Sequence, residues 1–115
     1  MASEAHEGGC HCGAVRYTAT LDLNEPVIAC NCSICRAKAL LLSFVAGDKL
    51  NIQQGEGELA TYLFNTRKIG HRFCRNCGVE VFGQVEGQGA AVNVRTLDGI
   101  AIERLNMQPF DGASR

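Results

Sequence analysis

The sequence is poor in aromatic residues, prolines and long apolar runs. Its 115 residues include 5 Phe, 2 Tyr, 2 Pro and no Trp. The core must therefore be built mainly from Val, Leu, Ile and Ala, with help from groups that cross-link the chain. The longest apolar stretch, 39–46, is interrupted by Ser43. Because a membrane-spanning helix needs roughly 20 apolar residues, we expect no membrane association.

The chain also lacks an excess of charge of either sign. Lys and Arg total 11, Asp and Glu total 12, and the formal net charge is −1. This balance excludes a general electrostatic attraction to nucleic acid or anionic lipid, so we expect no nucleic-acid partner. The first nine residues have neither the basic start nor the apolar segment of a secretory signal. We therefore expect a cytoplasmic protein, and the length predicts a single domain over residues 1–115.

Cysteine, in contrast, is abundant. The 7 cysteines are an odd number, which argues against a simple disulfide framework. In a reducing compartment, cysteines are more often metal ligands or catalytic groups than disulfides. They fall into three clusters, which are C-H-C at 10–12, C-N-C-S-I-C at 30–35 and C-R-N-C-G at 74–78.

The spacing of these clusters predicts two zinc sites. Structural zinc takes four protein ligands, whereas catalytic zinc commonly takes three and keeps one position open. The simplest partition is a closed structural site and an open catalytic site, made respectively by Cys10, Cys12, Cys74 and Cys77 and by Cys30, Cys32 and Cys35. For the first group, disulfides or a redox pair are the alternatives. For the second, the alternatives are inert cysteines in a tight loop, or a closed site completed by His71 or another residue.

The rest of the sequence predicts a mostly antiparallel β protein with little helix. Apolar and polar residues alternate in short segments that are separated by Gly-rich turns. We expect one helical turn at 33–38, a strand at 40–45 that is buried on both faces, and other strands at 15–20, 27–30, 49–53, 59–65, 71–74, 79–85 and 91–95. The first six or so residues and the tail at 111–115 should be loosely held. Phe44, Phe73 and Phe82 are expected in the core.

Four segments of the chain together resemble a known family. They read GCHCGAVRY at 9–17, CNCSICR at 30–36, RFCRNCG at 72–78 and VNVRTLD at 92–98. In order and spacing they are similar to the glutathione-dependent formaldehyde-activating enzyme / centromere protein V family. The resemblance implies a β-tent fold of packed antiparallel sheets, with structural zinc on the first four cysteines named above and catalytic zinc on the other three. It also implies condensation of formaldehyde with glutathione to S-(hydroxymethyl)glutathione, a carbon–sulfur lyase activity.

Several residues near the open site are candidates for supporting roles. Zinc held by three thiolates can bind and deprotonate a thiol, whose sulfur then adds to a small aldehyde. Arg36 and Lys38 are expected to bind a carboxylate of a glutathione-like substrate, unless they are ordinary solvated cations. His71 is a candidate proton shuttle, with a structural role as the alternative. Arg95 and Asp98 are expected to form an ion pair that braces the last strand.

A different class of function also fits the sequence. If both metals are structural, the domain is a binding module for a nucleic acid or a protein. Four cations within a segment that contains no acid would form its basic patch, namely Arg67, Lys68, Arg72 and Arg75. The alternative is a solvated face beside the third cysteine cluster. A thiol redox or metal-handling role is a third hypothesis.

Overall fold

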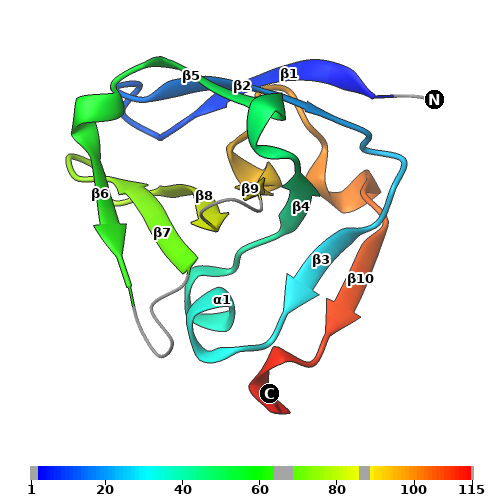
Figure 1. Ribbon diagram of the computed structural model, residues 1–115. Helices are drawn as coiled ribbons and strands as arrows, with labels where there is room; N and C mark the ends of the chain where they lie inside the picture. The colour runs from blue at the N-terminus through cyan, green and yellow to red at the C-terminus, as the bar shows by residue number, and fades with distance from the viewer. Residues whose placement is uncertain (1–2, 64–68, 86–88, 115) are drawn as a thin grey trace.

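Two β-sheets enclose a shared core (Figure 1). The computed structural model describes residues 3–63, 69–85 and 89–114. The three-stranded sheet has the order β1-β2-β5, formed by Glu4–Gly9, Arg16–Leu21 and Leu50–Gln54. The seven-stranded sheet has the order β10-β3-β4-β9-β8-β7-β6, formed by Met107–Phe110, Val27–Cys30, Leu42–Val45, Gly89–Asn93, Glu80–Val85, Ile69–Cys74 and Leu59–Tyr62. The expected mostly β fold of packed small sheets is confirmed.

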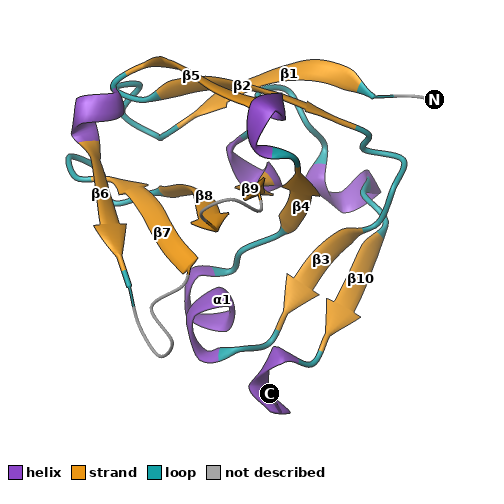
Figure 2. Cartoon of the chain, in the orientation of Figure 1, coloured by secondary structure: helices purple, strands orange, loops and turns teal. Residues whose placement is uncertain are grey.

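In the part of the chain that the structure describes, helical structure is confined to short segments, as Figure 2 shows. The predicted helical turn is α1, Ser33–Lys38. Five 3₁₀ turns lie at Gly47–Lys49, Glu56–Glu58, Val94–Thr96, Ile102–Arg104 and Gly112–Ser114. Within the described residues, no helix has the length and apolar character needed to cross a membrane.

The N-terminal segment is held by strand pairing, contrary to expectation, and an unpredicted strand lies just before the tail at 111–115. Strand β1 begins at Glu4 and pairs antiparallel with β2 in a register that joins Glu4 to Leu21 and Gly9 to Arg16. Strand β10, which the sequence pattern did not predict, pairs parallel with β3. The other strand pairs are antiparallel. Backbone hydrogen bonding therefore orders segments whose side chains gave no strand pattern.

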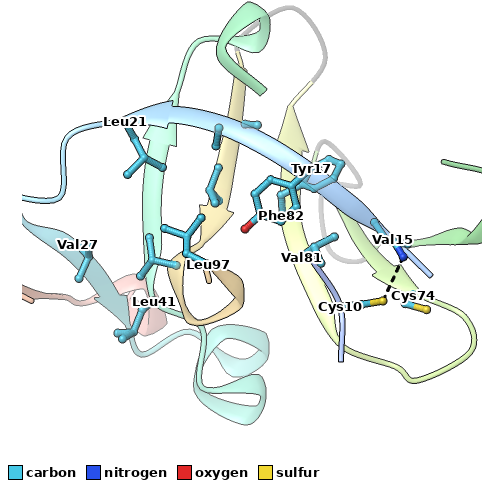
Figure 3. Packing of buried hydrophobic residues seen from close by; sticks show 14 residues of the cluster. Cys10, Val15, Tyr17, Leu21, Val27, Leu41, Cys74, Val81, Phe82 and Leu97 are labelled. Atoms are coloured by element: carbon cyan, nitrogen blue, oxygen red, sulfur yellow. Dashed lines mark hydrogen bonds between the residues drawn. The ribbon is translucent and has the colours of Figure 1, made fainter. Parts of the chain in front are cut away.

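The core lies between the two sheets and is built mostly from small aliphatic residues. Tyr17 of β2 and Phe82 of β8 are its largest fully buried side chains (Figure 3), joined by Val15, Val81 and Val92. The Tyr17 hydroxyl lies 2.6 Å from the Thr96 hydroxyl. Burial raises the pKa of Tyr17 to about 12, although the hydrogen bond with Thr96 opposes this rise. The Tyr17 side chain is therefore an uncharged phenol in the core at neutral pH.

The strand expected at 40–45 differs from the prediction. Leu40 and Leu41 are buried, but they precede β4, which begins at Leu42. Phe44 is 68% exposed, so β4 is not buried on both faces and Phe44 is not a core residue. The expectation for Phe82 is confirmed, while Phe73 is only half-buried.

The predicted ion pair between Arg95 and Asp98 is also wrong. Asp98 instead pairs with the guanidinium of Arg16 in β2, and this contact lowers the pKa of Asp98. Arg95 Nε donates a hydrogen bond of 2.7 Å to the carbonyl oxygen of Ala39, the residue that ends α1. Asp98 thus connects its segment to β2, and Arg95 connects the same segment to the end of α1.

Candidate metal centres

The first and third cysteine clusters meet in space. Cys10, Cys12, Cys74 and Cys77 place their sulfur atoms within 4.8 Å of one another. The Cys10–Cys12 and Cys12–Cys74 sulfur distances are both 3.6 Å. A tetrahedral zinc site with bonds of about 2.3 Å has sulfurs about 3.8 Å apart. This donor set therefore fits a four-coordinate zinc ion, as the spacing predicted.

Two tight turns aim these sulfurs at one point. Gly13 and Gly78 follow the two pairs with φ of +82° and +83°, a conformation that disfavours other residues. The backbone N–H groups of Val15 and Asn76 donate to the sulfurs of Cys10 and Cys74, both at 3.3 Å. Figure 3 shows the Cys10 and Cys74 side chains close together, with the Val15 contact as a dashed line. Such N–H donors stabilise thiolate ligands.

The electrostatics of this group favour the thiolate at Cys10 and Cys77 but not at Cys12. The backbone N–H of Ala14 lowers the pKa of Cys12, but burial and the three neighbouring thiols raise it to about 11. Burial opposes ionisation of Cys77, but the backbone N–H groups of Val79 and Cys12 and the neighbouring thiols lower its pKa to about 6. The pKa of Cys10 is likewise lowered, against the effect of burial, by the Val15 N–H and two neighbouring thiols. Thiolate is the form that binds metal.

The middle cluster forms a second group of three sulfurs, which we call the cysteine trio: Cys30, Cys32 and Cys35. Cys30 ends β3, Cys32 precedes α1, and Cys35 lies buried within α1. The three sulfurs lie within 4.8 Å of one another, and no His, Asp or Glu of the described chain joins them. His71 therefore does not complete this group. The donor set fits a zinc ion with one position left for another ligand.

The thiols of the trio differ in their readiness to ionise. Burial raises the pKa of Cys35, and the neighbouring Cys32 raises it further. Burial also opposes ionisation of Cys32, but the backbone N–H groups of Cys35 and Ile34 and the two other thiols lower its pKa. The backbone N–H of Cys32 lies 3.4 Å from the Cys30 sulfur.

The C-terminal segment packs directly against the trio. Asn31 donates from Nδ2 to the Asp111 carboxylate at 3.1 Å and accepts from the Ala113 N–H at 2.9 Å. A Cβ placed on Gly112 would lie 2.5 Å from the Cys30 sulfur and 3.2 Å from Cys32 Cβ. Residues 111–113, expected to be loose, therefore form one side of the candidate site.

A buried acid connects two of the predicted supporting residues. Glu80, at the start of β8, has a side chain only 1% exposed. Its Oε1 lies 2.9 Å from Lys38 Nζ, and its Oε2 lies 3.0 Å from His71 Nδ1. Lys38 also lies over the ring of Phe73, 5.0 Å from its centroid. Lys38 is one helical turn beyond Cys35 in α1, so this network reaches the helix that carries a ligand of the trio.

The remaining candidate residues are Arg36 and the cations of the proposed basic patch, and their contacts differ. Arg36, next to Cys35, is exposed and makes no ion pair with any described residue. In the proposed basic patch, Arg67 and Lys68 lie outside the described residues. Arg72 hydrogen-bonds to the neutral amide of Gln84, whereas Arg75 pairs with Glu58 at 3.5 Å, so of these two cations only Arg75 has a counter-ion among the described residues.

Sequence reasoning missed Glu80 and Gly112. Glu80 alternates with Val79 and Val81 in a pattern typical of a solvent-facing strand position, yet the bulge between β7 and β8 brings it to a buried position. Gly112 was grouped with a loose tail. A lone acid between valines and a glycine near a terminus are weak signals, because their roles depend on residues distant in sequence.

The comparisons with known proteins agree with this geometry. Residues 5–110 match the family described as glutathione-dependent formaldehyde-activating enzyme. A crystal structure of a Rhodobacter sphaeroides protein is similar to this fold, with a TM-score of 0.81 and 32% sequence identity over 90% of this chain and 97% of that one. Because the family match covers nearly the whole sequence and includes all seven cysteines, the chain belongs to the glutathione-dependent formaldehyde-activating enzyme family.

Proposed function

We propose that this protein catalyses the reversible addition of a thiol, glutathione or a close analogue, to formaldehyde or another small aldehyde, a carbon–sulfur lyase-type reaction. One zinc ion on Cys10, Cys12, Cys74 and Cys77 would be structural. A second, on the cysteine trio, would be catalytic. The single observation that carries this proposal is the trio itself, whose three converging sulfurs have no fourth His, Cys, Asp or Glu partner among the described residues.

The reaction balances without a redox partner. The thiol sulfur forms a bond to the carbonyl carbon, the C=O π bond breaks, and the thiol proton ends on the new hydroxyl oxygen. Zinc, when bound at the trio, supplies a Lewis-acid position that lowers the pKa of a thiol ligand. The chain itself would position the two reactants side by side, which removes much of the entropic barrier to a two-molecule reaction.

The cations near the trio have separate tasks in this proposal. Arg36 is exposed and adjacent to Cys35, so it would bind a carboxylate of the thiol substrate. Lys38, although proposed from the sequence for the same task, is held by Glu80, and it would chiefly fix the end of α1. The hydrogen-bonded His71–Glu80 pair can hold a proton between Nδ1 and Oε2, which supports a proton-transfer role for His71.

The cellular setting is part of the proposal. None of the seven cysteines forms a disulfide in the described chain, and thiolate zinc ligands suit a cytoplasmic location where thiols stay reduced. The partners would be the small thiol and aldehyde, without nucleic acid or membrane.

The test combines metal analysis with a direct rate measurement. Zinc-loaded protein should hold two zinc ions per chain, and X-ray absorption should show one of them changing its ligands when glutathione is added. Exchange spectroscopy with ¹³C-formaldehyde and glutathione should show faster formation of the adduct. Cys35→Ser should abolish this acceleration, whereas Ser33→Ala, on the same helix, should retain it. Fully loaded protein that does not accelerate the reaction would overturn the proposal.

A further inference from the structure

A second candidate site lies between the two sheets. A cavity of about 250 Å³ is lined by β5 and the following turn on one side and by β7, β8 and β9 on the other. Its polar lining consists of Arg72, Glu56, Asn51 and Gln84. Ligand pockets usually enclose about 300–1,000 Å³, so this cavity suits a molecule the size of an amino acid.

Arg72 is incompletely satisfied in this cavity. One of its Nη atoms donates to Gln84 Oε1 at 3.3 Å, and its guanidinium lies over the Phe82 ring, 5.9 Å from the centroid. Its Nε is buried and makes no hydrogen bond. Arg72 also forms no ion pair with any residue that the structure describes. Because this Nε is closed to a solvent-sized group, a ligand in the cavity would meet the Nη groups of Arg72, and a carboxylate is the group that best satisfies them.

The cavity is separate from the cysteine trio. Successive side chains of a strand point to opposite faces of a sheet, so Arg72 and His71 of β7 lie on opposite faces. His71 bonds to Glu80, which in turn bonds to Lys38 of α1, the helix that carries Cys35. The cavity therefore lies on the other face of the seven-stranded sheet, and its ligand does not depend on the proposed function.

The two charged residues that line the cavity, Arg72 and Glu56, determine which charges a ligand must carry. Glu56 is exposed, and it pairs neither with Arg72 nor with any other described cation within 4.0 Å. One cation and one anion thus face the same cavity without neutralising each other. A simple carboxylate would satisfy only Arg72, and a simple amine only Glu56.

We propose that this cavity binds a small α-amino acid as a zwitterion. Its carboxylate accepts hydrogen bonds from Arg72, its ammonium donates to Glu56, and the amides of Asn51 and Gln84 fix its orientation. Each charge of the ligand meets the opposite charge of the protein, so the site distinguishes amino acids from acids and from amines.

The test is a titration of the zinc-loaded protein with L-alanine, followed by ¹H–¹⁵N NMR. Saturable shifts are expected for the backbone amides of Arg72, Phe82 and Gln84, while acetate and ethylamine should bind at least about tenfold more weakly. Arg72→Gln and Glu56→Gln should each reduce the affinity by about tenfold or more.

Two control variants test whether L-alanine binds in this cavity. Arg75→Gln removes a nearby cation that lies outside the cavity and should leave L-alanine binding unchanged. Cys35→Ser should also leave it unchanged, whatever the outcome at the trio. No saturable shift up to the solubility of L-alanine, unaltered binding by Glu56→Gln, which changes only an exposed side chain, or equal binding of acetate would each overturn the proposal.

Discussion

At the scale of single residues, Glu80 is the most consequential group outside the cysteines. A carboxylate that is 1% exposed is stable only when its charge is compensated. Here Lys38 and His71 each contact one oxygen, at 2.9 and 3.0 Å. Asn93 Nδ2 also donates to the Glu80 carbonyl at 2.9 Å, so both the backbone and the side chain of Glu80 are fixed.

Glu80→Gln should therefore reduce stability measurably. The amide keeps the shape of the side chain but loses the charge that Lys38 contacts, and we expect unfolding to become easier by about 1–3 kcal/mol. Urea unfolding of the zinc-loaded protein measures this difference. Glu58→Gln is the matched control, because its ion pair with Arg75 is exposed and should be worth less than about 1 kcal/mol. Equal losses in the two variants would show that burial of Glu80 contributes nothing.

Gly112 offers a second residue-scale prediction, at the trio. An alanine there would place its Cβ 2.5 Å from the Cys30 sulfur, so the sulfur or the C-terminal turn must move. Gly112→Ala should weaken zinc binding at the trio by about tenfold and leave the four-cysteine site unchanged. Competition with a chelator, which resolves the two zinc ions, is the measurement. Gly57→Ala is the control, because its Cβ would meet nothing within 4 Å. Unchanged zinc affinity in Gly112→Ala would mean that the turn adapts freely.

At the scale of elements, α1 is held at Ala39, the residue that follows the helix and caps its C-terminal end. Ala39 ends the helix with φ of +55°, a left-handed conformation that is unfavourable for alanine. The Arg95 contact to its carbonyl fixes this end, and the backbone N–H of Leu40 donates to the Cys35 carbonyl at 3.0 Å. The strain thus lies directly after the helix that presents Cys35.

Ala39→Gly should stabilise the protein by about 0.5–1 kcal/mol, because glycine adopts this conformation without strain. Ala37→Gly, inside the same helix and also exposed, should instead destabilise it by about the same amount. Thermal unfolding of the two variants beside the parent protein tests both signs. Destabilisation by both substitutions would show that the Ala39 conformation carries no strain.

Sequence-based prediction is most accurate for elements that depend on neighbouring residues and least accurate for those that depend on residues distant in sequence. α1 was predicted correctly, because a six-residue helix depends on neighbouring residues. The two cysteine groups meet as expected although one of them joins distant segments, because that expectation came from the four ligands of structural zinc and not from local sequence. β1 and β10 were missed, since their residues are mostly exposed and only pairing with β2 and β3 orders them. Phe44 was misplaced because an apolar run predicts burial, whereas its β-strand position faces outward.

At the scale of the whole molecule, the four-cysteine site joins the two sheets. Cys10 and Cys12 lie in the turn between β1 and β2 of the smaller sheet, and Cys74 ends β7 of the larger one. Cys12 and Cys74 are 62 positions apart in sequence. The trio, by contrast, lies within one loop and the start of α1. A zinc ion at the first site therefore closes a long loop, while one at the trio closes only a short one.

This difference predicts unequal effects of losing each site. A structural zinc contributes on the order of 10 kcal/mol to folding, comparable with the whole net stability of a small domain. Cys74→Ser should leave the chain largely unfolded in a zinc buffer, and a strong chelator should have the same effect on the parent protein. Cys32→Ser, the matched change at the trio, should keep the native circular dichroism and amide protection. If Cys74→Ser stayed folded while Cys32→Ser unfolded, the aliphatic core would be sufficient to join the sheets, and the structural role would belong to the trio.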